Sequence, residues 1–159
     1  MRTIKFKAKR LDNKEWTCGY FYEENDNTYI IEDRQNECML NRNIPYKVVS
    51  DTVCQFTGFL DKNGKEIYEG DVLRSDNYPF SCVRDDAYNN YYGIVGWSEV
   101  SACFYVKTFV NPRAHVDGIS HGNIYDMPCY NFQDFEVVGS VHDKEWQEKL
   151  NYNPYEEEE

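Results

Sequence analysis

The segment Gln55–Arg74, QFTGFLDKNGKEIYEGDVLR, constrains the fold more than any other part of the chain, because two turn signals interrupt its short apolar runs. Asp61-Lys62-Asn63-Gly64 is typical of a turn in which Asn and Gly adopt positive φ, and Glu69-Gly70-Asp71 predicts a second corner. We therefore expect a tightly bent β-structure that supplies scaffold and no chemistry. The residues predicted to shape it are Gly58, Asp61, Asn63, Gly64, Tyr68, Gly70 and Asp71.

The size and composition of the chain favour one ordinary β-rich domain. It has 159 residues, and its 14 Tyr, 9 Phe and 3 Trp favour the half-buried surfaces of β-sheets. We expect a single domain over residues 1–150. The remaining residues 151–159 end in four Glu and are expected to form an acidic disordered tail.

The net charge of −11 argues against nucleic acid as a general partner, because affinity for phosphate depends largely on Lys and Arg. The exception is Met1–Arg10, which contains five basic residues and no acid. On a strand, its side chains would separate into a basic face (Lys5, Lys7, Lys9) and an apolar face (Ile4, Phe6, Ala8). The simplest interpretation is a solvated face opposite a buried one.

The cysteines are spaced too widely for the usual zinc sites. The six residues Cys18, Cys38, Cys54, Cys82, Cys103 and Cys129 form no CxxC pair. No secretory signal is recognised at the N-terminus, and no apolar run approaches the roughly 18 residues of a membrane span. We expect a cytoplasmic protein with reduced cysteines and no membrane association.

The remaining pattern predicts short strands, two long loops and one helix. Strands are expected near residues 3–9, 16–22, 28–31, 46–49, 52–57, 92–97, 102–110 and 135–141, with hairpins at 3–22 and 92–110. Phe135, Val137, Gly139 and Val141 would share one face of the last strand. Residues 75–92 and 111–131 lack periodicity and are expected to be irregular insertions. Asp143 can begin a helix that ends at Leu150, with Trp146 and Leu150 on one side and Glu145 beside Lys149.

The central segment resembles the signature of the YopX family, small proteins of unestablished function met mostly in phages and prophage regions. Gln55–Phe59 and Asp61–Val72 match that signature almost residue for residue, with weaker matches at Ile4–Ala8 and Phe135–His142. The resemblance implies a mainly β fold, α+β at most, with a small SH3-like barrel-type core. It implies no established activity, and the two insertions are where this chain is longer than the family.

Candidate chemical groups have structural explanations that we favour. Glu66, Glu69 and Asp71 lie close in sequence and would suit acid–base or cation chemistry, but they flank turns where backbone NH groups need acceptors. His115, His121, Asp117, Asp126 and Cys129 are near one another but match no metal-ligand spacing. Cys103 or Cys129 could pair with a histidine only if the fold brings them together. We expect no catalytic, cofactor or metal site.

Tyrosines in and beside the insertions suggest an association surface. They are Tyr78, Tyr88, Tyr91, Tyr92, Tyr125 and Tyr130, joined by Phe80 and Phe132. Aromatic side chains bury large area at interfaces for little lost rotamer entropy, although loops folded onto their own core remain an alternative. The leading hypothesis is a non-enzymatic module that associates with protein, first of all with itself. The alternatives are a nucleic-acid-associated or DNA-mimicking phage factor, and an enzyme using the acids or a histidine.

Overall fold

The computed structural model describes residues 3–32, 44–75, 91–109, 124–126, 135–150 and 154, and these residues are mostly β-strand. They form two compact units that meet in sequence within one strand, residues 1–58 and 59–159. The mainly β prediction, with one short helix near the C-terminus, is confirmed. That the two units constitute one domain over residues 1–150 stays a prediction.

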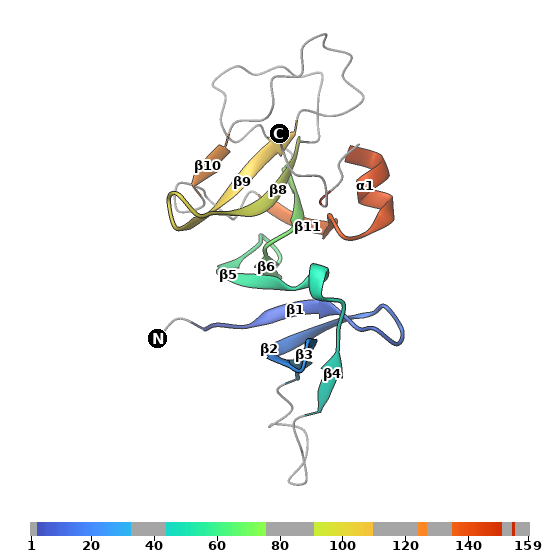
Figure 1. Cartoon of the computed structure of the whole chain (residues 1–159). Helices are drawn as coiled ribbons and strands as arrows, with labels where there is room; N and C mark the ends of the chain where they lie inside the picture. Colours follow the sequence, from blue (N-terminus) through green and yellow to red (C-terminus); the bar gives the residue numbers. More distant parts are fainter. Residues whose placement is uncertain are drawn as a thin grey trace, which may run out of the picture. The chain divides into compact units, whose positions relative to one another are not determined.

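Unit 1 contains an antiparallel sheet with the strand order β4-β3-β2-β1-β5 (Figure 1). Its strands are β1 Phe6–Lys9, β2 Trp16–Glu24, β3 Asn27–Ile31, β4 Pro45–Lys47 and β5 Cys54–Leu60, with the 3-10 turn η1 Ser50–Thr52 before β5. The expected first hairpin is confirmed, since Phe6 pairs with Gly19 and Lys9 with Trp16. The buried core of this unit is small: Ala8, Ile30 and Val48, with Phe6 and Val53 against them.

Unit 2 contains a second antiparallel sheet in the order β10-β9-β8-β7-β11. Its elements are β6 Glu66–Tyr68, β7 Asp71–Ser75, β8 Tyr91–Ser98, β9 Cys103–Phe109, β10 Ile124–Asp126, β11 Phe135–Ser140 and α1 Lys144–Leu150. The expected hairpin of β8 and β9 is confirmed, with Val95 opposite Val106. Among the described strands neither sheet closes on itself, so the barrel-type core takes the form of two open sheets.

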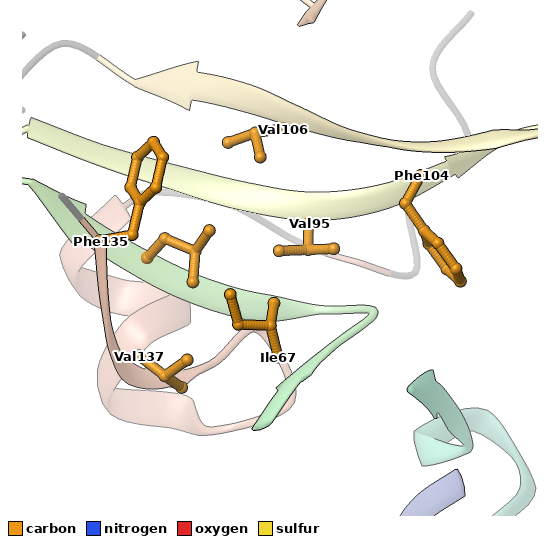
Figure 2. Packing of buried hydrophobic residues seen from close by; sticks show 7 residues of the cluster. Ile67, Val95, Phe104, Val106, Phe135 and Val137 are labelled. Atoms are coloured by element: carbon orange, nitrogen blue, oxygen red, sulfur yellow. The ribbon is translucent and has the colours of Figure 1, made fainter. Parts of the chain in front are cut away.

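The β7–β8 part of this sheet is covered on both faces, because consecutive strand residues point to opposite sides. Leu73 and Val95 belong to a cluster with residues of β6, β9 and β11, which Figure 2 shows from close by. Their neighbours Val72 and Ile94 belong to a second cluster, beneath α1. Neighbouring side chains in the sequence thus build two separate cores.

A register shift in β11 corrects the expected face of that strand. The pairing of β11 with β7 is interrupted between Val137 and Gly139, as in a β-bulge. Val137 therefore lies in the first cluster and Val141 in the cluster beneath α1, whereas the alternation had placed them on one face. Strict alternation fails here because the bulge inserts one residue into the pairing.

The helix packs against Gly139, and this close contact yields a prediction. A Cβ built on Gly139 would lie 1.9 Å from Nε1 of Trp146, a side chain that is buried beneath α1. We expect Gly139→Ala to lower the free energy of unfolding by about 1–3 kcal/mol, since the ring has to shift. Urea unfolding followed by circular dichroism measures this. The control measures the same loss of stability in a protein that already carries Trp146→Leu. If Gly139→Ala lowers the free energy of unfolding equally in both backgrounds, the contact with Trp146 is not the cause.

Two further expectations are corrected, and others fall outside the described residues. Residues 111–131 were expected to be irregular throughout, but β10 pairs with β9 at Ile124–Asp126. In the first turn only Gly64 has positive φ, at 79°, whereas Asn63 was expected to share it. Most of both insertions and nearly all of the tail lie outside the described residues. No described helix has the length and apolar character needed to cross a bilayer.

Candidate functional site

Asp61 links the first turn of the signature segment to an edge of the second sheet. Its Oδ1 accepts hydrogen bonds from the backbone NH groups of Asn63 and Lys65, both at 2.8 Å. Its Oδ2 accepts one from the NH of Val137 at 2.9 Å, and the NH of Lys62 donates to the carbonyl of Phe135 at 2.8 Å. One carboxylate group therefore holds the turn in place and also accepts a hydrogen bond from a backbone NH group on the outer edge of β11.

The pKa of the Asp61 carboxyl group is lowered by these contacts. Burial of the group acts in the opposite direction and raises the pKa, but the NH donors of Val137, Lys65 and Asn63 and the charge of Lys65 outweigh it. The side chain is 6% exposed, so the ionised form is held by the backbone and not by water. Asp61 is a structural anion.

The second corner is built around Gly70 and Asp71. Gly70 has φ of 72°, where a side chain is strained, and its NH donates to the carbonyl of Val95 while its carbonyl accepts from the NH of Val141. Asp71 is fully buried and its Oδ2 accepts from the NH of Tyr68 at 2.8 Å. The corner thus connects β6, β8 and the residue after β11.

The acidic residues considered for catalysis or cation binding have separate structural roles. The Oε2 atom of Glu66 accepts the Tyr68 hydroxyl at 2.7 Å, and Asp71 holds the corner as described. Glu69 is half-buried in the turn between β6 and β7. The structure therefore gives Glu66 and Asp71 specific internal partners, which favours the structural interpretation of this acid cluster.

Glu136 is the centre of an ion-pair network that sequence reasoning missed. Its Oε2 atom accepts a hydrogen bond from Nη2 of Arg74 at 2.6 Å and lies 3.2 Å from Nζ of Lys62. Hydrogen bonds from Lys62 and Arg74 lower the pKa of this carboxyl group. The three residues are far apart in the sequence and meet because β11 pairs with β7, a register that no local pattern reveals.

The aromatic residues proposed for an interface are only partly described. Tyr92 is half-buried and its ring lies 5.5 Å from that of Trp146, with Lys149 5.0 Å above it. This contact fits the alternative in which such rings pack on their own core. The backbones of Tyr91 and Tyr125 lie in β8 and β10, and the others, Tyr78, Tyr88 and Tyr130 with Phe80 and Phe132, lie outside the described residues.

The basic face of β1 lies over aromatic rings from neighbouring strands. The Nζ atoms of Lys7 and Lys9 are 4.7 and 5.4 Å from the centre of the Trp16 ring, and that of Lys5 is 4.9 Å from the Phe56 ring. The sequence predicted the lysine face but not its aromatic partners, because the partners depend on which strands pair with β1. The simple solvated face is therefore a mixed cationic and aromatic surface.

The metal and cysteine candidates receive no support from the part of the chain that is described. Within it, no three or more ligating side chains gather as a metal site would require. Residues His115, Asp117, His121 and Cys129 lie outside it, and of Asp126 only the backbone is described. Of the described cysteines, Cys18 is exposed, Cys103 is half-buried and Cys54 is buried.

Comparison with known proteins assigns the chain to a family. The crystal structure of protein EF1440 from Enterococcus faecalis is similar at 18% identity and a TM-score of 0.44, covering 89% of this chain and 95% of that one. A search of curated proteins finds no match. The family model described as YopX protein matches residues 5–145, which include the Asp61 turn, the Gly70 corner and both sheets. The chain therefore belongs to the YopX family.

Proposed function

We propose that this chain is a non-enzymatic β-rich module that acts in a phage or prophage setting by associating with protein, and first of all with a second copy of itself. The scaffold supports this view, since Asp61, Asp71 and Glu66 each serve internal hydrogen bonds. These acids hold turns and corners together. We therefore look for the function of the module in its exposed surfaces.

One apolar patch on unit 1 carries the proposal. The rings of Phe6 and Phe21 lie 5.3 Å apart, and Phe21 is 37% exposed. Ile4 is two residues before Phe6 in the direction of the strand and is 58% exposed. These three residues, which we name the apolar corner, offer adjoining hydrophobic surface of the kind enriched at the centres of interfaces.

A second copy is the partner that this corner suits best. An interface around a two-fold axis uses the same patch on both subunits, so a patch needs only to be complementary to itself. Aromatic rings meet this condition readily, because edge-to-face and offset arrangements are both favourable.

Light scattering after size-exclusion chromatography tests self-association. We expect the protein at tens of micromolar to have a mass above the 18.9 kDa of one chain, and Phe21→Ser to return it to that value. Tyr20→Ser is the matched control, since the adjacent ring points to the opposite face of the strand and is also exposed. A monomeric wild type at this concentration would reject the proposal.

A further inference from the structure

Opposite the apolar corner, the sheet of unit 1 carries lysines and aromatic rings on one continuous face. Residues that pair directly across antiparallel strands share a face. Lys7 pairs with Cys18 and Lys9 with Trp16, and further along β2 Tyr22 pairs with Tyr29. We define the lysine–aromatic face by Lys5, Lys7, Lys9, Trp16, Tyr20 and Tyr22.

We propose that the lysine–aromatic face binds single-stranded nucleic acid. Such sites combine cations that follow the phosphate backbone with aromatic rings on which bases stack, and they need no sequence-specific contacts. Both components occur here on one face of the sheet, since the register of β1 and β2 places them together. Strands β1 and β2 lie side by side in Figure 1. The site lies apart from the apolar corner, so it is independent of self-association.

The lysines form a row suited to a phosphate backbone. Alternate residues of a strand lie about 6.6 Å apart, which is comparable with the spacing of phosphates along an extended single strand. Lys7 and Lys9 extend over Trp16, and Lys5 over Phe56. Because these rings already restrict the lysine side chains, less conformational entropy is lost when phosphates bind.

The rings provide the stacking surface. Tyr20 is 53% exposed, and Tyr22 is stacked on Tyr29 with centres 5.0 Å apart and planes 13° from parallel. Stacking on a side chain requires a base that is free of its own duplex stack, so these rings favour a single strand over a double helix.

The acidity of the whole chain does not oppose this site, because the excess negative charge lies elsewhere in the sequence. Residues 1–58 contain nine Lys and Arg against nine Asp and Glu, whereas residues 59–159 contain eight against nineteen. Unit 1 is therefore neutral as a whole, and the net charge of −11 comes entirely from residues 59–159. A local cationic row within a neutral unit can attract phosphate.

Fluorescence anisotropy with a labelled oligothymidylate and the full chain tests the phosphate contacts. Affinity should fall as salt rises, with a slope of log K against log salt of about −0.7 per phosphate contact. Changing Lys5 and Lys7 together to Gln should make the slope shallower by about 1.4. The control changes Lys144 and Lys149 of α1 to Gln, which removes the same charge from unit 2 and should leave the slope unchanged.

The same titration tests the stacking contacts. Tyr20→Ser should weaken binding by about 5- to 150-fold, the effect of losing one stacked base, whereas Trp97→Ser, at an exposed ring of unit 2, should not. Absence of binding at low salt would overturn the proposal. So would a duplex of the same length that binds as tightly, or polyglutamate that competes at the same concentration as the oligonucleotide and so assigns the face to an acidic peptide.

Discussion

Leu73→Ala is expected to lower the free energy of unfolding by about 2–5 kcal/mol, the usual cost of emptying a buried leucine site. Leu73 has no exposed surface and belongs to the cluster shared by β6, β7, β8, β9 and β11. The labelled members of this cluster in Figure 2 come from several different strands. Truncation removes contacts with several of them at once, and a sheet covered on both faces has little freedom to collapse into the space.

The matched control for this change is Leu60→Ala. Leu60 is 50% exposed at the end of β5, so the same chemical change there should alter stability by no more than about 0.5 kcal/mol. Chemical unfolding of both variants under identical conditions compares them. Equal effects at the two positions would show that the cluster around Leu73 is not the core of unit 2.

Asp61→Asn is expected to cost at least about 2 kcal/mol, although the two side chains have nearly the same shape. The amide can keep an oxygen toward Asn63 and Lys65, but its NH2 group then faces the NH of Val137, donor against donor. A buried NH without an acceptor costs about 1–3 kcal/mol, and the remaining bonds lose the benefit of a charged acceptor. Unfolding by urea, monitored by circular dichroism, measures the loss.

The pH dependence of Asp61→Asn separates its charge from its shape. Because the pKa of Asp61 is lowered by folding, its stabilisation is complete above the unfolded pKa of about 3.9 and is lost as the pH falls through the folded pKa. The difference between wild type and Asp61→Asn should therefore narrow below about pH 4. Asp51→Asn, at an exposed position in η1, is the control and should have a small effect. A difference that persists unchanged in acid would contradict the role of the charge.

Local sequence patterns correctly predicted the elements that depend on neighbouring residues alone. The Gly64 turn and the Gly70 corner require positive φ, which glycine tolerates, and both appear where the sequence predicted them. Trp146 and Leu150, one helical turn apart, are buried together on α1 as expected. The signature segment also pointed to the YopX family, and the family model confirms it.

Contacts between distant segments were decided only by the tertiary structure. The bulge that divides Val137 from Val141 depends on how β11 pairs with β7, and the same pairing brings Arg74 to Glu136. Asp61 was expected to shape its own turn, but its second oxygen holds Val137, 76 residues away. The lysines of β1 were visible in the sequence, whereas the rings beneath them were not, because strand order determines which side chains become neighbours. Backbone preferences and alternation act over a few residues and can be inferred from the sequence, while register and strand order follow from burying the whole chain at once.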